Sequence, residues 1–293
     1  MTESLLTPTS AMRIARRGRR RRRLPAIVVV SMVWLGLLVA LVALAPVLPL
    51  PDPATSDYSA VRLAPFVSID HILGTDNLGR DILSRLISGA AVSLAVGVGS
   101  VAIAVVLGTA MGAVAGYFGG IADRVMSWAT DILLAFPSLI ALIAITSFLG
   151  PSMWTLIIGL GVVSIPMVAR VARSATMSFA QRDFVSAAKA IGTPEGRILR
   201  REILPNIAPT VISFAVTLIA IAIVAEGAMS FLGLGVPAPQ ASWGGMMNEG
   251  RGDLRTAPFI VMAPAIAMCV TLLAINFVAD WISRRFDSRG SHV

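Results

Sequence analysis

Long apolar stretches constrain this chain more than any other feature of its sequence. Each is long enough to cross a hydrocarbon layer ~30 Å thick, because a helix rises about 1.5 Å per residue. There are six of them, at approximately residues 25–45, 90–115, 125–149, 153–171, 207–232 and 258–278. The sequence therefore predicts an all-α membrane protein with six transmembrane helices.

Composition excludes a water-soluble domain. Of the 293 residues, 56% are hydrophobic and 14% are charged, whereas roughly a quarter of a soluble domain is charged. A disordered chain is excluded as well, because disorder requires few apolar residues and much charge. The single cysteine, Cys269, has no partner in the chain, so we expect neither an internal disulfide nor a thiolate metal site.

The first apolar stretch, residues 25–45, follows a run of arginines and has two interpretations. One is a cleaved signal peptide, because the sequence from Ala43 to Ala45 resembles a peptidase site. Its apolar core is too long for an ordinary signal region, however, and Pro46 directly after that site would hinder cleavage. We therefore expect a retained transmembrane helix, preceded by a cytoplasmic arginine-rich tail at residues 1–24.

The distribution of basic residues predicts the orientation of the chain. Of 24 arginines and lysines, 19 lie on the side of both termini and of the connection between the fourth and fifth stretches, and 5 on the other side. Positive charge favours the cytoplasm, so we expect both termini there and the protein in the lipid bilayer of the inner (cytoplasmic) membrane. The basic residues lack interleaved aromatic residues, and we expect no nucleic-acid partner.

Residues 46–89 form the predicted extracytoplasmic segment, which opens with a proline-rich linker that cannot continue a helix. Thr75 is a candidate N-cap for a helix in which Leu78, Ile82 and Leu86 recur at four-residue spacing. We expect this amphipathic helix to lie on the outer membrane surface, and a solvated helix packed on the bundle is the alternative. The parts that follow are a core of five transmembrane helices, residues 90–281, and a cytoplasmic tail, residues 282–293.

Small and aromatic residues in the apolar stretches predict how the helices pack. Gly108 and Gly112 form a GxxxG pattern, and small residues of this kind let helix backbones approach closely in lipid. Trp243 and the four other tryptophans mostly fall near predicted span ends. We interpret the tryptophans as interfacial belt residues.

No catalytic site is visible in the sequence. His71 and His292 lie far apart and belong to no cluster with metal-ligand spacing. A phosphate-binding loop of the form GxxxxGK[ST] needs a lysine after glycine, and the only lysine, Lys189, follows Ala188. We therefore expect a chain without catalytic residues, metal or cofactor of its own, for which another subunit would hydrolyse any ATP.

The cytoplasmic connection at residues 172–206 is the most informative part of the sequence. A short helical face with small residues precedes Gly192, Thr193 and Pro194, which break it. A second basic helix follows to about Ile203 and is expected to end before Pro205. Two short helices bent at a glycine would project from the membrane as a lever toward a soluble partner.

This connection resembles the EAA loop in permease subunits of bacterial ABC importers. Ser186, Ala187 and Ala188 stand at the EAA positions, Gly192 at the glycine, and Leu204 with Pro205 at the end, at the spacing of that motif. Two positions depart from it, because Ser186 replaces the acidic residue and Glu202 replaces an isoleucine. A salt bridge from the first position is therefore in doubt, whereas the bent two-helix shape is retained.

Four further segments resemble one permease subunit of the dipeptide, oligopeptide and nickel group of these importers. They begin at His71 (HILGTDNLGRDILSRLISGA), Asp131 (DILLAFPSL), Ser230 (SFLGLGVPAPQASWGGMM) and Phe277 (FVADWISRRFD). The resemblance implies a type I ABC importer permease fold whose coupling helix seats in an ATPase cleft. The coupling residues that it implies are Ser186, Ala187, Ala188, Gly192, Thr193, Pro194, Leu204 and Pro205.

The resemblance also implies partners. These are a second homologous permease, one or two ATPase subunits that bind ATP and magnesium, and an extracytoplasmic substrate-binding protein. The implied function is uptake of dipeptides or oligopeptides. Glutathione stays open as a substrate, and a nickel or other small-solute importer is the alternative.

Polar residues within the spans are candidates for the translocation path or its gating. Asp131 lies about 9 Å into the third span, where a buried acid needs a partner. Pairing with an arginine of the following cytoplasmic connection and a place on the path are both open. Glu226 lies roughly 28 Å beyond Ile207, close to the outer boundary, and Asn276 lies near the inner end of the last span.

The sequence disfavours two rival functions, a secondary transporter and an intramembrane enzyme. A secondary transporter predicts inverted repeats and acids at the membrane midplane, and we find no convincing repeat between the halves. An intramembrane enzyme would need facing catalytic groups, and the estimated depths of Asp131 and Glu226 keep these two acids apart.

Overall fold

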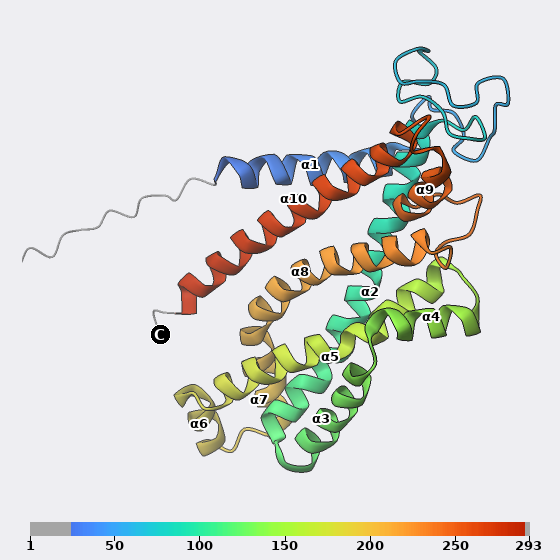
Figure 1. Cartoon of the computed structure of the whole chain (residues 1–293). Helices are drawn as coiled ribbons and strands as arrows, with labels where there is room; N and C mark the ends of the chain where they lie inside the picture. Colours follow the sequence, from blue (N-terminus) through green and yellow to red (C-terminus); the bar gives the residue numbers. More distant parts are fainter. Residues whose placement is uncertain (1–24, 291–293) are drawn as a thin grey trace, which may run out of the picture.

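The computed structural model describes residues 25–290, with side chains up to residue 285, and every regular element in that range is a helix. The predicted tail of residues 1–24 lies outside the described residues. Figure 1 shows the long helices as an elongated bundle with a loop-rich region at one end. The helices are α1 (Ala26–Leu44), α2 (Ile82–Phe118), α3 (Gly120–Ala135), α4 (Ser138–Leu149), α5 (Met153–Ala180), α6 (Asp183–Ala190), α7 (Glu195–Ile198), the π-helical η1 (Leu199–Ile203), α8 (Leu204–Phe231), α9 (Trp243–Gly250), the 3-10 turn η2 (Arg251–Asp253) and α10 (Phe259–Gly290).

Five helices within residues 25–285 are long and apolar enough to cross a membrane. One of the five is the continuous helix that α7, η1 and α8 form together. The third predicted span is broken into α3 and α4, which are bent by 82°. Pro137 lies at the break and holds Phe136 in an extended conformation (ψ 129°), which a helix cannot continue. The described residues therefore contain five candidate spans, or six if the bent pair crosses as one.

The second span begins earlier than its apolar stretch, at Ile82 instead of Ala90. Asp81 is its N-cap, because the Asp81 carboxylate accepts a hydrogen bond of 2.7 Å from the Ser84 N–H. The prediction of a helix capped by Thr75 is wrong. Residues 46–81 contain turns and no helix, since Gly79 adopts a φ of +77° that interrupts a right-handed helix.

Thr75 instead stabilises the loop of residues 46–81. Its hydroxyl accepts a hydrogen bond of 2.8 Å from the Leu63 N–H and donates one to the Ala60 carbonyl. Its backbone forms an isolated bridge with Asp81. The residue therefore ties the middle of the loop to the start of α2.

Four charged side chains join this loop to the membrane helices. Arg80 donates to Asp76 at 2.7 Å and to Glu249 of α9 at 2.5 Å. Arg85 of α2, only 1% exposed, donates to Glu249 at 2.7 Å. Because two buried arginines share two carboxylates, the charges compensate each other away from water. The loop, α2 and α9 are thus fixed to one another.

The core of the bundle is built on close contact between α2 and α5. A Cβ atom at Gly108 would lie 2.8 Å from the Val168 Cβ, and one at Gly112 would lie 2.9 Å from the Ala172 Cβ. Real Cβ atoms do not approach so closely, so only glycine permits this crossing. The packing role predicted for the GxxxG pattern is confirmed.

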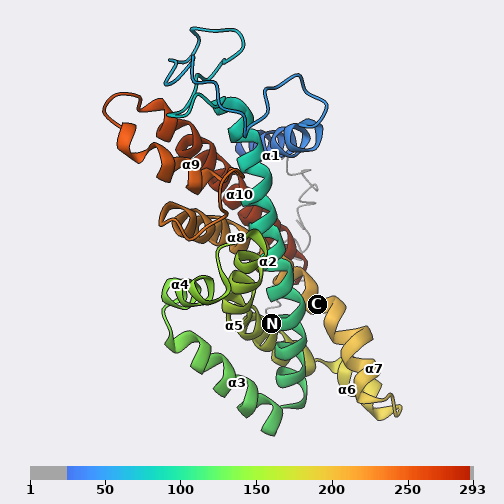
Figure 2. The same ribbon diagram turned by 90° about the vertical axis from the view of Figure 1, so that its right-hand side faces the viewer.

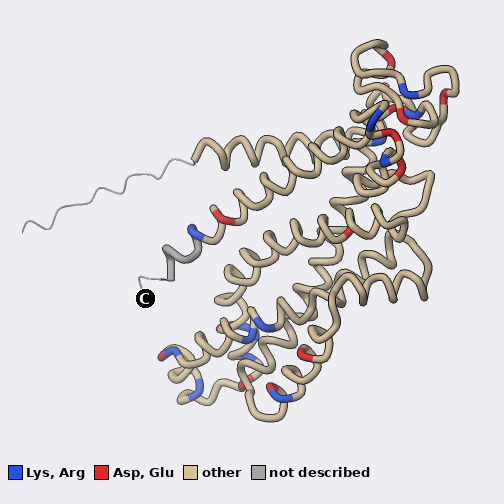
Figure 3. Tube along the Cα trace, viewed as in Figure 1, with Lys and Arg blue, Asp and Glu red and all other residues tan. Residues whose placement is uncertain are grey.

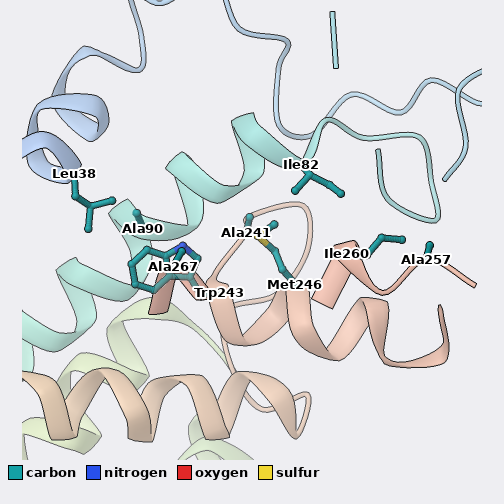
Figure 4. Close-up of a cluster of buried hydrophobic side chains, with 9 residues drawn as sticks. All are labelled: Leu38, Ile82, Ala90, Ala241, Trp243, Met246, Ala257, Ile260 and Ala267. Atoms are coloured by element: carbon teal, nitrogen blue, oxygen red, sulfur yellow. The ribbon is translucent and has the colours of Figure 1, made fainter. Parts of the chain in front are cut away.

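A second part of the core surrounds Trp243 (Figure 4). This side chain is fully buried beside Ala90 of α2 and Ala267 of α10. Its indole N–H donates to the Leu86 carbonyl at 3.0 Å. The interpretation of Trp243 as a belt residue is therefore wrong, and the side chain instead anchors α9 inside the bundle.

The two ends of the molecule differ in structure. The loop of residues 46–81 lies at one end, and α6 with α7 lies at the other, as both views show (Figures 1 and 2). Charged residues are concentrated at these ends and are sparse between them (Figure 3). This arrangement is typical of a bundle whose middle lies in hydrocarbon and whose ends reach water.

Candidate coupling site

Residues 183–206 form a bent protrusion at one end of the bundle. Its first arm is α6, in which Asp183 lies in the first turn and Lys189 in the last, where each charge complements the helix dipole. Val185 is the buried residue of this helix. The other side chains of α6 are exposed or half-buried, so most of the arm remains accessible to a partner.

The bend lies at Gly192, as the sequence predicts. The Gly192 N–H donates to the Lys189 carbonyl at 3.0 Å, and the Thr193 N–H donates to the Ala188 carbonyl at 3.1 Å. These bonds form a Schellman motif, which satisfies the last carbonyls of a helix. Gly192 has a φ of +76°, a conformation that other residues rarely adopt. The turn thus depends on glycine at this position.

The second arm differs from the prediction. The Pro194 carbonyl accepts from Arg197 and Ile198, which starts α7. The helix does not end before Pro205: it continues through the π-helical turn η1 into α8. Pro205 has no N–H and would clash with the carbonyl four residues earlier in a regular helix, and the wider π turn before it relieves that conflict. The arm and the span are therefore one continuous rod.

An apolar cluster anchors both arms to the bundle. Val185 from α6 is buried together with Ile198 and Ile203 from the second arm, against Ala113 of α2. Phe179 at the end of α5 packs on the same cluster. Because the arms share one buried cluster with α2 and α5, we expect the protrusion to move together with these helices.

Polar contacts add a second anchor. The Tyr117 hydroxyl at the end of α2 donates to the Glu195 carboxylate. Lys189 of α6 lies 3.6 Å from Glu195 and 5.0 Å from the centre of the Tyr117 ring. Three elements thus meet around Glu195, which holds the two arms at a fixed angle.

The predicted coupling residues lie on one protrusion but differ in exposure. Ala188, Thr193 and Leu204 are half-buried because they face the apolar cluster or the bend. The exposed ones are Ser186, Ala187, Gly192, Pro194 and Pro205.

Two apolar side chains of the helical face predicted for this segment were not among the predicted coupling residues. Ile191 is 83% exposed and stands next to the glycine of the bend, and Phe184 is 38% exposed on α6. Exposed apolar residues beside small ones are typical of an interaction surface. The signal was present in the sequence, because Ile191 precedes the helix-ending Gly192 and so cannot be covered by a following turn.

A basic groove on the second arm was also not predicted from the sequence. It has a volume of about 570 Å³ and is lined by Pro194, Gly196, Arg197, Arg200 and Arg201. The three arginines recur at spacings of three and four residues and therefore share one face of the helix. That spacing was the sequence signal that pointed to a common surface.

Asp131 of α3 is paired with an arginine, which is one of the two alternatives that the sequence left open. Its carboxylate accepts a hydrogen bond of 2.6 Å from Arg170 of α5, and both side chains are more than half exposed in this chain. A neighbouring pair, Arg173 with Asp123, joins the same two helices closer to the end of the bundle that carries α6. Together the pairs fix α3 beside α5.

Glu226 and Asn276 take different positions from Asp131. Glu226 of α8 is fully buried, and its two oxygens accept hydrogen bonds of 2.7 Å from Ser93 and Ser230. Asn276 is exposed on α10 and donates to the Leu272 carbonyl of its own helix at 2.8 Å. Among the described residues, no hydrogen bond or ion pair joins these three path candidates, so the structure does not bring them into one site.

Residues 25–285 contain no group of three or more histidine, cysteine or acidic side chains placed to hold one metal ion. Exposed apolar side chains occur on the protrusion, at Ile191, and on the loop of residues 46–81, at Phe66.

Comparison with known proteins gives this geometry a context. Residues 104–292 match the family described as the binding-protein-dependent transport system inner membrane component. The chain is 36% identical over 233 residues to the glutathione transport system permease protein GsiD of Pectobacterium atrosepticum, covering 80% of this chain and 77% of that protein. It is 38% identical over 222 residues to the dipeptide transport system permease protein DppC of Alkalihalophilus pseudofirmus, covering 76% and 73%.

The fold also has a solved counterpart. A chain from inward facing conformations of the MetNI methionine ABC transporter superposes with a TM-score of 0.58, covering 70% of this chain and 97% of that one. At 20% sequence identity this is a likeness of fold. It confirms the all-α importer-permease fold predicted from the sequence.

Proposed function

Because the chain belongs to the family of inner membrane components of binding-protein-dependent transport systems, we propose that it is a permease subunit of an ATP-driven peptide importer. The observation that carries this proposal is the bent protrusion of residues 183–206. It combines an exposed small-residue face with a rigid connection to a membrane span. The chain would bind no ATP itself, and separate ATPase subunits would supply ATP and magnesium.

The protrusion can transmit force because of how it is built. The Schellman turn at Gly192 and the polar contacts of Glu195 hold its arms at a fixed angle. Its second arm is continuous with α8, so a displacement of α6 by an ATPase becomes a tilt of a transmembrane helix. Ala187 and the exposed Ile191 would be in the ATPase contact, and the half-buried Ala188 would support it.

The opposite end of the molecule is suited to receiving substrate. The loop of residues 46–81 is held by the buried charges of Arg80, Arg85 and Asp76 and by the partly exposed Glu249. A fixed outer platform is what a substrate-binding protein would need for docking. A second, homologous permease would complete the path, and the termini and α6 would lie in the cytoplasm of the cell.

The substrate class follows from the relatives. One relative is named for glutathione transport and another for dipeptide transport, and both substrates are short peptides. We therefore assign dipeptides or oligopeptides, including glutathione, as the substrate class. A nickel or other small-solute importer is the alternative.

Purification and uptake together test the proposal. The chain would be co-expressed with the candidate permease, ATPase and binding-protein subunits of its own organism, and the complex would be reconstituted in proteoliposomes. We expect a complex that takes up labelled dipeptide only when ATP and the binding protein are supplied. Uptake by this chain alone, driven by a proton gradient without ATP, would establish the rival secondary transporter. Uptake of a nickel chelate and not of peptides would establish the alternative substrate.

A further inference from the structure

The basic groove beside the coupling bend is not needed for the lever described above. Its arginines are Arg197, Arg200 and Arg201, all exposed. Within the described part of the chain none of the three has an ion pair, although acidic residues such as Glu195 and Glu202 lie close in sequence. Three adjacent positive charges repel one another, so an unpaired arrangement in a common groove indicates an anionic ligand.

The position of the groove along the helix identifies the surroundings of that ligand. Arg201 precedes Ile207, where the apolar run of α8 begins, by six residues. Six residues of helix span about 9 Å. The polar headgroup layer on each side of a bilayer is about 5–7 Å thick, and an arginine side chain can extend toward it. The guanidinium groups of Arg201 and of the adjacent Arg200 are therefore within reach of lipid headgroups, whereas Arg197, ten residues before Ile207, lies farther from the membrane.

The packing of the second arm shows which way the groove opens. Ile198, Leu199 and Ile203 bury the opposite face of the same helical segment against α2 and α5. The arginines consequently point away from the bundle. The apolar contact residue Ile191 does not line the groove, and of the predicted coupling residues only Pro194 does. The basic surface therefore borders the surface suited to an ATPase and overlaps it only at Pro194.

We propose that this groove binds the phosphate-bearing headgroup of an acidic lipid on the cytoplasmic side. A guanidinium presents a planar pair of donors that matches the oxygens of a phosphate, and basic pockets beside membrane helices bind such headgroups. A headgroup held there would fix the foot of α8, the rod that links the coupling arm to the membrane. The effect of this fixation on transport rests on the proposed function, whereas lipid binding itself does not.

Native mass spectrometry of the assembled complex tests the proposal. The complex would be equilibrated in mixed micelles with equal amounts of phosphatidylglycerol and zwitterionic phosphatidylethanolamine. We expect retention of phosphatidylglycerol in the intact protein. The triple variant Arg197→Gln, Arg200→Gln, Arg201→Gln should lose it, with a decrease of about 5-fold for each charge removed.

A matched control separates the groove from net charge. Arg124, in the α3 segment at the same end of the bundle, is exposed and has no ion pair in the described structure. Arg124→Gln should leave retention of phosphatidylglycerol unchanged, because its charge lies outside the groove. Equal loss in the control and in each single groove variant would overturn the proposal, since it would show a diffuse electrostatic effect.

Two further outcomes would also overturn it. If the triple variant retains acidic lipid but loses its ATPase subunits, the arginines bind protein. If inorganic phosphate raises the thermal stability of the complex in phosphatidylethanolamine nanodiscs, and the triple variant abolishes that effect, the ligand is a free phosphate. Peptide uptake is measured separately, so failure of lipid binding leaves the proposed transport function standing.

Discussion

At the scale of single residues, the coupling bend depends on Gly192. Its φ of +76° is strained for any other residue, although a side chain would meet no atom within 4 Å. We expect Gly192→Val to distort the turn at a local cost of about 1–3 kcal/mol. The ratio of peptide taken up to ATP hydrolysed by the reconstituted complex should fall severalfold, while membrane insertion stays normal.

Gly196 provides the control for this prediction. It also has open space around it, but its φ does not lie in the left-handed region. Gly196→Ala should leave the coupling ratio unchanged, because alanine fits a helical position. An unaltered ratio in Gly192→Val would contradict the idea that this turn transmits force.

A buried carboxylate, Glu226, is the second residue with a testable role. It accepts hydrogen bonds from the hydroxyls of Ser93 and Ser230. The Ser93 hydroxyl in turn accepts one from the backbone N–H of Trp243 at 3.4 Å. Glu226→Ala removes the acceptor of two serine hydroxyls and leaves a cavity, at a cost of about 2–4 kcal/mol. The thermal unfolding temperature of the purified complex should fall accordingly.

The isosteric variant distinguishes structure from charge at this position. Glu226→Gln keeps the shape and can still bond both serines, so we expect most of the stability to be retained. If Glu226→Gln abolished peptide uptake at normal stability, the negative charge itself would act in transport. If Glu226→Ala unfolded like the wild type, the buried contacts would contribute nothing measurable.

At the scale of elements, α9 is positioned by direct contact with the backbone of α8. A Cβ atom at Gly244 would lie 2.7 Å from the Gly227 Cα, and backbone atoms cannot move aside as a side chain can. Gly244→Ala should therefore displace α9 and weaken the anchoring of Trp243. We expect a fall in the unfolding temperature and faster proteolysis of the outer loop.

The adjacent glycine is the matched control for α9. At Gly245 an added Cβ would meet only the Ser242 hydroxyl oxygen, at 3.3 Å. Gly245→Ala should have little effect on either measurement. Equal behaviour of the two variants would show that the close approach of α8 and α9 is not required.

Helix boundaries show where local patterns succeed and fail. The bend at Gly192 was predicted because a glycine followed by proline ends a helix through its own backbone. The start of α2 was not predicted. Asp81 caps that helix, and the loop that places Asp81 is held by contacts between distant residues, such as Arg85 with Glu249. Pro205 was expected to end a helix, but a π turn absorbs it.

At the scale of the whole molecule, the orientation in the membrane is a prediction of its own. The loop of residues 46–81 and α6 lie at opposite ends of the bundle, and the basic residues favour α6 in the cytoplasm. A fluorescent protein fused after Val293 should fluoresce in cells. Alkaline phosphatase inserted after Asp52, in the exposed start of the loop, should be active outside the cytoplasm. Reversal of both results would invert the proposed topology.

The candidate site was predictable only in part. The position of the protrusion and its bend followed from Gly192, Pro194 and the resemblance at Ala187 and Ala188. The basic groove and the exposed Ile191 emerged from the three-dimensional structure, because exposure depends on which faces the neighbouring helices cover. The sequence left open whether Asp131 is paired or lies on the translocation path, and only the structure places Arg170 of α5 beside it.

Apolar length, small residues and helix-ending residues act over a few neighbouring positions. They determined the membrane location, the approximate places of the long apolar helices and the coupling bend from the sequence alone. Pairing of charges and burial of single side chains depend on segments far apart in the chain. Glu226 bonds Ser93, and Arg85 bonds Glu249, each across more than a hundred positions. Only the tertiary structure decided these contacts, because a buried polar group needs a partner beside it and these partners come from distant segments of the chain.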